Sequence, residues 1–231
     1  MKIGGLQPVT LLDYPQKVAA IIFTIGCNMR CPFCYNPSLV LSSSMKSTSE
    51  ISEVDIINFL KKRRKYLDGI VITGGEPTLQ GDLARFCRKL KKMDYLIKLD
   101  TNGLLPNNLQ KLTDEKLIDY IAMDIKAPLE KYHKVAGVGE NVENINESVK
   151  IIIKSGLPHE FRSTIVSGLH NRSDIKKMAG IVSGADKYFL QNFKKQKNLV
   201  GKGFDGRGFT QKTMKEFRDI VSNYVSRCEI R

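Results

Sequence analysis

Short apolar segments rich in β-branched residues alternate with amphipathic segments along almost the whole chain of 231 residues. The first, residues 18–24 (Val-Ala-Ala-Ile-Ile-Phe-Thr), has the length and composition of a buried strand. A helix that Ser52 can cap and Gly69 can end leads to the next. In all, six strand–helix units are predicted, with strands at 18–24, 70–73, 95–99, 120–123, 160–166 and 188–191. The alternation favours a parallel sheet, doubly wound or curled into a barrel, with too few units for a complete eightfold barrel.

The apolar share of the chain, 42%, is sufficient for a hydrophobic core. We expect a single domain over residues 1–231, with its core at about 18–193 and a closing helix at about 210–227. No stretch reaches the ~18 consecutive apolar residues of a membrane span, and the opening Met-Lys-Ile-Gly-Gly lacks the apolar core of a signal peptide. These features predict a soluble protein of the cytoplasm. A serine-rich loop at residues 42–49 can cover a site, although a solvated loop is the simpler account.

Three of the five cysteines, Cys27, Cys31 and Cys34, fall within eight residues. An odd count and a reducing cytosol argue against a disulfide framework, so this group indicates metal or redox chemistry. Three thiolates suit a cubane iron–sulfur cluster, because sulfur is the soft ligand such centres require and three ligands leave one iron open. The other two cysteines are expected to do no chemistry: Cys87 lies on the apolar stripe of a predicted helix, and Cys228 is an incidental thiol near the carboxyl terminus.

Two other interpretations of the cysteines stay open. A zinc site requires four ligands, and no histidine lies near the three cysteines in sequence. The segment Cys31-Pro32-Phe33-Cys34 has the spacing of a thioredoxin-like redox pair, but that mechanism has no use for Cys27.

The formal net charge of +13 is compatible with a nucleic-acid partner, an acidic protein partner, an anionic substrate or a solvated basic surface. The densest basic run, residues 61–65, lies at the end of a predicted helix, where cations complement the helix dipole. A structural reason therefore suffices for this run, and no nucleic-acid function is inferred from it.

Most of the unusual polar residues follow directly after predicted strands. After the first strand come the three cysteines, and the later strand ends carry segments 74–77 (Gly-Gly-Glu-Pro), 100–103 (Asp-Thr-Asn-Gly) and 124–126 (Asp-Ile-Lys), and Gln191-Asn192. Arg162 lies within the fifth predicted strand. Taken separately, each is an ordinary turn or strand end. In parallel α/β folds, however, the carboxyl ends of the strands meet at one face, where binding sites form. The sequence therefore predicts one shared ligand site.

Two segments carry a specific resemblance: residues 27–37, which read Cys-Asn-Met-Arg-Cys-Pro-Phe-Cys-Tyr-Asn-Pro, and the later Gly-Gly-Glu-Pro. The chain resembles the radical S-adenosylmethionine (SAM) superfamily in these segments, and within it the glycyl-radical enzyme activases. Residues 4–15 resemble the amino terminus of the anaerobic ribonucleoside-triphosphate reductase activating proteins, to which the pyruvate formate-lyase activating enzyme is a close cousin. The resemblance extends from this opening segment to Gln191. It implies the radical SAM fold, a partial (β/α)6 barrel of the TIM type.

The resemblance also implies the cofactors. A [4Fe–4S] cluster would be held by Cys27, Cys31 and Cys34, with the amino and carboxylate groups of SAM on the remaining iron. The backbone of the Gly-Gly-Glu segment would receive the SAM ammonium, which is physically sensible because glycines let a backbone approach closely. Lys126 would pair with the SAM carboxylate.

Further positions are implied to contact SAM or an ion. Phe33 and Val166 would meet the adenine, and Arg162 and Asn192 occupy places where relatives contact ligand. Three oxygen-bearing positions match those that hold a monovalent cation in the pyruvate formate-lyase cousin, although capping by the same side chains needs no ion. The full set expected at the cofactor is Phe33, Gly74, Gly75, Glu76, Asp100, Thr101, Asn102, Asp124, Lys126, Arg162, Val166 and Asn192, of which Asp100, Thr101 and Asp124 match the cation positions.

The implied activity is reductive cleavage of SAM, with an electron from flavodoxin or ferredoxin, to generate a glycyl radical on anaerobic ribonucleoside-triphosphate reductase. No acid–base side chain is required, so no catalytic side chain is named. Two departures weaken the subfamily match: Tyr35 stands where many activases carry histidine, and Ser167-Gly168 where some relatives have proline-glycine. The alternatives are another glycyl-radical enzyme as target, a small-molecule enzyme like a 7-deazaguanine synthase, or a basic metal-binding module without chemistry.

Overall fold

The computed structural model describes residues 1–41, 49–139 and 141–231. Most of the predicted serine-rich loop, at 42–48, lies outside the described residues. The chain forms two compact units: unit 1 comprises 1–28, 36–101 and 107–121, and unit 2 comprises 29–35, 102–106 and 122–231. The single domain expected over the whole chain stays a prediction.

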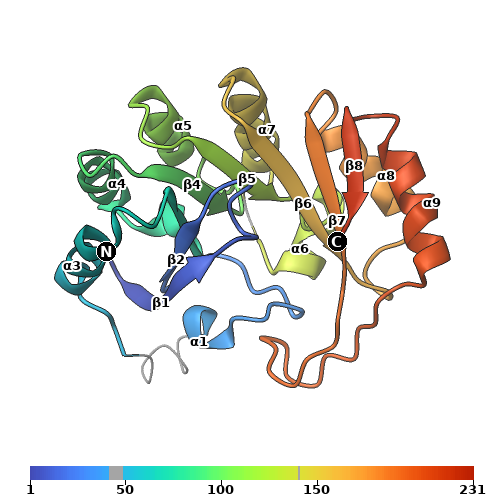
Figure 1. The fold of residues 1–231 in the computed structure, drawn as a ribbon. Helices are drawn as coiled ribbons and strands as arrows, with labels where there is room; N and C mark the ends of the chain where they lie inside the picture. The colour runs from blue at the N-terminus through green and yellow to red at the C-terminus, as the bar shows by residue number, and fades with distance from the viewer. Residues whose placement is uncertain (42–48, 140) are drawn as a thin grey trace. The chain divides into compact units, whose positions relative to one another are not determined.

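Unit 1 contains four neighbouring strands in chain order: β1 (Ile3–Thr10), β2 (Ala19–Thr24), β3 (Gly69–Gly74) and β4 (Leu96–Thr101) (Figure 1). The first pair is antiparallel and the other two pairs are parallel. In register, Ile22 lies beside Ile72, which lies beside Leu99. All three are buried, so the unbroken apolar runs in the sequence reflect strands covered on both faces. Its helices are α1 (Pro37–Val40), α3 (Glu53–Arg63), α4 (Leu83–Lys91) and α5 (Pro106–Asp114), with a 3₁₀ turn η1 (Pro77–Leu79).

The amino-terminal strand β1 was not among the predicted elements. Pro8 and the two glycines interrupt its alternating pattern, and its pairing with β2 shifts register between Ile3 and Gly5 and again between Gln7 and Thr10. Among the described residues, β2 is the one named strand that pairs with β1, which also forms an isolated bridge from Ile3 to Ile51. A proline, which cannot donate a ladder hydrogen bond, is tolerated in such an edge strand. An irregular strand of this kind leaves no clear periodic signal in the sequence.

Local capping explains where α3 begins. The Ser52 side chain accepts the Asp55 amide at 3.1 Å, which confirms the predicted cap. The prediction that Gly69 ends this helix is wrong: α3 ends at Arg63, and Gly69 is the first residue of β3. A Cβ at Gly69 would lie 2.9 Å from the Leu96 carbonyl oxygen and 2.9 Å from the Tyr14 ring, so glycine is required there by close packing.

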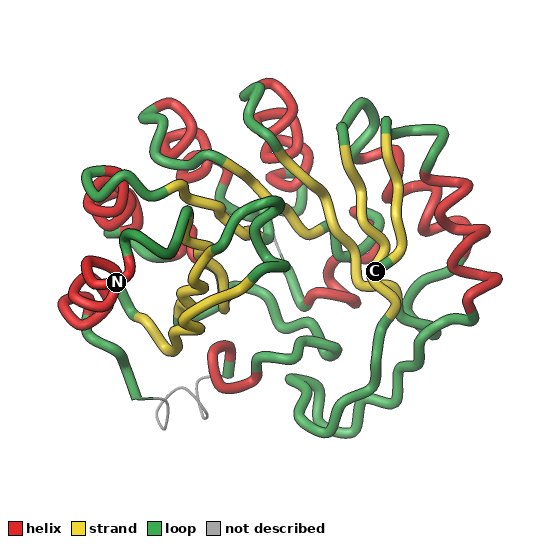
Figure 2. The backbone as a smooth tube through the Cα atoms, in the orientation of Figure 1, coloured by secondary structure: helices red, strands yellow, loops and turns green. Residues whose placement is uncertain are grey.

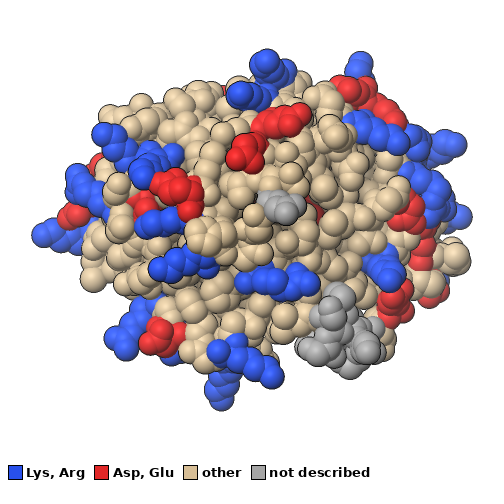
Figure 3. Space-filling view, turned by 180° about the vertical axis from the view of Figure 1, so that it is seen from behind, with Lys and Arg blue, Asp and Glu red and all other residues tan. Residues whose placement is uncertain are grey.

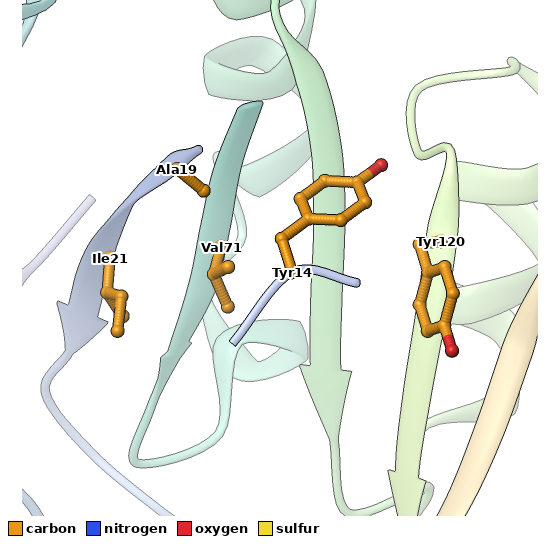
Figure 4. Close-up of a cluster of buried hydrophobic side chains, with 5 residues drawn as sticks. All are labelled: Tyr14, Ala19, Ile21, Val71 and Tyr120. Carbon is orange, nitrogen blue, oxygen red and sulfur yellow. The ribbon is translucent and has the colours of Figure 1, made fainter. Parts of the chain in front are cut away.

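A cluster of Tyr14, Ala19, Ile21, Val71 and Tyr120 packs against one face of the unit 1 strands (Figure 4). The two tyrosine rings meet at 5.9 Å with an interplanar angle of 59°. Elsewhere in this unit, α4 buries Cys87 completely, and burial raises the pKa of its thiol to about 12. The prediction that Cys87 is a core residue is therefore confirmed.

Strand β5 (Tyr120–Asp124) begins in unit 1 and ends in unit 2. Unit 2 continues with three parallel strands in chain order: β6 (His159–Ile165), β7 (Lys187–Asn192) and β8 (Arg227–Ile230). Its helices are α6 (Tyr132–Ala136), α7 (Asn144–Lys154), α8 (Arg172–Ile181) and α9 (Gln211–Val221), with a 3₁₀ turn η2 (Leu129–Lys131). All six predicted strands are present, and the α/β class is confirmed.

The expected closing helix at 210–227 is partly wrong. Thr210 caps α9, but the helix ends at Val221 and the chain then forms β8. The apolar residues Val225 and Cys228 are three apart, which continues a helical period and conceals the strand. Pairing decides the outcome, because the Arg227 amide bonds the Asp186 carbonyl at 2.9 Å and Cys228 lies beside Tyr188 in the ladder. No helix of the described residues is long and apolar enough to cross a membrane.

Candidate functional site

The segment after β3 packs against the end of β2. The Gly75 amide donates to the Thr24 carbonyl at 2.9 Å, and the Glu76 amide donates to the Gly26 carbonyl at 2.7 Å. Gly74 has φ +114°, and a Cβ at Gly75 would overlap the backbone of Gly26. Cys27 follows at once after Gly26, so the glycine pair and the first cysteine occupy neighbouring backbone within unit 1.

The Glu76 side chain is buried and binds protein groups. Its Oε1 accepts the Thr78 amide at 3.1 Å, the Thr78 hydroxyl at 2.5 Å and the Thr101 hydroxyl at 2.8 Å. This links the end of β3 to the end of β4. In the same unit Asp100 accepts from the buried Lys98 ammonium at 2.7 Å. Glu76 and Thr101, two of the predicted strand-end residues, are therefore bonded to each other, and Asp100 pairs with Lys98 of its own strand.

Cys31, Phe33 and Cys34 belong to unit 2, whereas Cys27 belongs to unit 1. Cys31 and Phe33 are buried, and Cys34 is partly exposed. A turn joins the two unit 2 cysteines, because the Cys34 amide donates to the Cys31 carbonyl at 3.1 Å. None of the five cysteines, all of which are described, is in a disulfide. Within the described ranges, no three His, Cys, Asp or Glu side chains are grouped so that they could hold a metal ion.

Asp124 lies between two cations at the end of β5. Its Oδ2 accepts from Lys126 Nζ at 3.0 Å, and its Oδ1 accepts from Arg162 Nε at 3.0 Å. Although burial acts in the opposite direction, Arg162 and then Lys126 lower the pKa of Asp124. Burial likewise opposes the charge on Lys126, but the Coulombic attraction of Asp124 raises its pKa. Arg162 Nη1 also lies 3.9 Å from Glu160 Oε1, so Arg162 is shared between two carboxylates, whereas among the described residues the Lys126 ammonium pairs with Asp124 alone.

The backbone of Lys126 is held on both sides. Its amide donates to the Tyr132 hydroxyl at 3.0 Å, and its carbonyl lies 2.8 Å from His170 Nε2. His170 Nδ1 accepts the Val166 amide at 3.0 Å, which assigns the ring proton to Nε2 and makes that nitrogen the donor to Lys126. Burial lowers the pKa of His170. His170 thus joins the segments after β5 and β6, a role that sequence reasoning missed because no spacing links residues 44 positions apart.

Three other predicted residues are engaged within unit 2. The Asn102 side chain accepts the Leu104 amide at 3.1 Å in a local turn. The Asn192 amide group makes two bonds with the Phe209 backbone, both at 2.8 Å, which closes the segment between β7 and α9. Val166 is fully buried, and a Cβ at Gly206 would lie 2.7 Å from it.

Comparison with known proteins gives consistent results. The family model of the Radical SAM superfamily matches residues 21–181. A protein of Methanocaldococcus jannaschii that carries the provisional name of glycyl-radical enzyme activating enzyme is 34% identical over 99% of this chain and 95% of its own length. The pyruvate formate-lyase-activating enzyme of Clostridium pasteurianum is 25% identical over 78% of this chain and 76% of its own length.

Among solved structures, Streptococcus suis SuiB bound to S-adenosylmethionine matches with a TM-score of 0.67 at 13% identity. The match covers 91% of this chain and 51% of that one, and it demonstrates a shared fold. Enzymes of this superfamily use a [4Fe–4S] cluster and SAM. The family model spans well over half of the chain, and the nearly full-length relative is above 30% identity, so the chain belongs to the radical SAM superfamily and is a radical SAM enzyme.

Proposed function

We propose that the protein is a glycyl-radical enzyme activase. The observation that carries the proposal is the alignment with the Methanocaldococcus jannaschii protein provisionally named a glycyl-radical enzyme activating enzyme. This alignment covers almost the entire length of both chains. The alignment with pyruvate formate-lyase-activating enzyme, over about three quarters of each chain, supports the same class. We further propose anaerobic ribonucleoside-triphosphate reductase as the target, on the resemblance of residues 4–15, and the cytoplasm as the location.

The donor chemistry of this chain suits the cofactors of the family. Cys27, Cys31 and Cys34 supply three soft sulfur donors. Gly74 and Gly75 have no side chains, so a ligand can approach their backbone closely. These three cysteines would hold the [4Fe–4S] cluster. When bound, the reduced cluster supplies the electron that cleaves SAM to methionine and a 5′-deoxyadenosyl radical.

The protein's own residues would bind and orient SAM. Lys126, whose charge Asp124 maintains, would pair with the SAM carboxylate, and carbonyls of the Gly74–Glu76 segment would accept from the SAM ammonium. The apolar, buried Phe33 and Val166 would exclude water beside the adenine. We also propose that the other predicted residues contact SAM, namely Asn102, Arg162 and Asn192. A monovalent cation would bind at Asp100, Thr101 and Asp124.

Electron paramagnetic resonance tests this function. Anaerobically reconstituted protein, a reductant and SAM are mixed with anaerobic ribonucleotide reductase from the same organism. A new glycyl-radical doublet that is absent with Cys31→Ala and retained with Cys87→Ala would support the activase. Production of 5′-deoxyadenosine without a doublet on any glycyl-radical enzyme supplied would reject the activase and favour a small-molecule substrate such as that of a 7-deazaguanine synthase.

A further inference from the structure

The segment between β7 and α9, residues 194–209, carries a net positive charge. It contains five basic residues and one acid, so its formal charge is five minus one, or +4. We call it the basic strap; it contains no helix or multi-residue strand (Figure 2). The residues concerned are Lys194, Lys195, Lys197, Lys202, Arg207 and Asp205.

The basic strap is bonded to the cysteine loop within unit 2. The Val200 amide donates to the Cys34 carbonyl at 3.1 Å, and the Gly201 amide donates to the Pro32 carbonyl at 2.9 Å. The approach is close enough that a Cβ on Gly201 would lie 2.6 Å from Pro32 Cβ. The strap therefore lies directly on the backbone that carries two of the proposed cluster ligands.

Tyr35 provides a second attachment. Its hydroxyl accepts the Lys194 amide at 3.1 Å and donates to the Lys194 carbonyl at 2.9 Å. The Tyr35 ring stacks on Phe193 at 5.8 Å with an interplanar angle of 7°. At 38% exposure Tyr35 still reaches the surface, and Cys34 beside it is partly exposed. A protein that contacts the strap thus comes close to the cysteine loop.

Within the described residues, no ion pair neutralises the charges of the strap. All five basic side chains are exposed, and no ion pair involves them among the residues the structure describes. On α4, by contrast, Arg85 and Lys89 both bind Glu53, and Arg88 binds Glu115. Basic and acidic side chains are also interspersed over much of the face in Figure 3. Unpaired charge on one segment attracts an acidic partner far more effectively than paired charge does.

We infer that the basic strap is the docking surface for an acidic protein that carries a single electron, such as a flavodoxin, and that this partner delivers its electron beside Cys34. The inference rests on the proposed roles of Cys31 and Cys34. Docking of the radical target is the competing occupant. The electron carrier is favoured because the strap is bonded to the proposed cluster ligands themselves, where the electron must arrive.

The first test measures binding of oxidised, acidic flavodoxin to the reconstituted protein by isothermal titration calorimetry. The triple variant Lys195→Gln, Lys197→Gln, Lys202→Gln is compared with Lys61→Gln, Lys62→Gln, Lys65→Gln on and just after α3, which removes the same charge from exposed residues of unit 1. We expect about a tenfold weaker affinity and a smaller dependence on salt for the strap variant only. Equal losses in both variants would overturn the inference, because net charge alone would then explain the binding.

The second test separates this inference from the proposed function. SAM cleavage is measured with dithionite and with reduced flavodoxin, and the rate ratio is compared among the three proteins. A ratio that falls several-fold in the strap variant alone would support docking of the carrier on the strap. If the strap variant instead binds the glycyl-radical enzyme more weakly and its rate ratio is unchanged, the inference is overturned and the strap is the docking surface for the radical target. A parent protein that cleaves no SAM with dithionite would refute the proposed roles of the cysteines, on which the inference rests.

Discussion

The segments that follow β3 and β5 are both expected to contact SAM, yet different forces hold them in place. After β3, Gly74 and Gly75 are fixed by backbone packing so close that no side chain fits. After β5, Lys126 is fixed by a carboxylate at 3.0 Å and by the neutral ring of His170. A packed segment tolerates no change of shape, whereas a charged one should tolerate changes of shape and respond to charge and pH.

The largest effect is expected from Gly75→Ala. Its methyl group would overlap the Gly26 backbone, which cannot move without displacing the adjoining Cys27, so we expect a loss of about 3 kcal/mol in unfolding free energy. Urea denaturation of the metal-free protein measures this loss, and iron content after reconstitution should fall with it. The matched control is Gly81→Ala, where nothing lies within 4 Å of the added Cβ. Equal stability of the two variants would show that β3 is held by something other than packing.

The next effect is expected from Lys126→Met. Removing an ammonium that pairs with a ligand carboxylate should weaken SAM binding by about 10- to 100-fold, because charge-assisted hydrogen bonds contribute roughly 1.5–3 kcal/mol. Stability should change little, since Arg162 still pairs with Asp124. Equilibrium dialysis with radiolabelled SAM provides the measurement, and Lys134→Met on α6 removes an exposed cation as a control. Unaltered affinity would exclude Lys126 from the SAM site.

His170→Gln tests the pH response. Burial, the largest cause, lowers the pKa of His170 below its usual 6.5, so the unfolded chain takes up a proton more readily than the folded protein. The stabilising effect of the neutral ring is therefore present above pH 6.5 and is lost as the pH falls through the lower folded value. Urea titrations at several pH values should show this decline in the parent and in the exposed control His133→Gln. If the unfolding free energy of His170→Gln falls with decreasing pH as much as that of the parent, a group other than His170 controls the acid sensitivity.

The smallest effect is expected from Glu76→Gln. The amide keeps an acceptor oxygen for Thr78 and Thr101 but loses the charge that strengthens those bonds, which should cost about 1 kcal/mol of unfolding free energy. The exposed Glu50→Gln is the control in the same denaturation experiment. If Glu76→Gln lost more unfolding free energy than Gly75→Ala, the comparison would be reversed, because charge rather than packing would then hold the segment after β3 in place.

Much of the fold could be predicted from the sequence because its signals are local. Runs such as residues 18–24 and 70–73 are apolar and β-branched, so their strands are legible without any partner. Strands β1 and β8 were missed for the opposite reason. Both are irregular or short, and each exists through pairing with a neighbouring strand in its unit.

The candidate site divides in the same way. The cysteines, the glycine pair and Lys126 could be singled out because residue type and position after a strand carry their chemistry. His170 could not, because its importance comes from one bond to Val166 and one to Lys126. The basic strap could not either, since exposed lysines are ordinary until their attachment to Pro32 and Cys34 is known.

The sequence by itself determined the order of strands and helices, the three clustered thiols and the polar residues at the strand ends, because those depend on side-chain type and on spacing along the chain. Only the tertiary structure decided which charges are paired, which histidine is neutral and which loop lies on the cysteines. Those properties depend on contacts between residues distant in sequence, which local pattern does not encode.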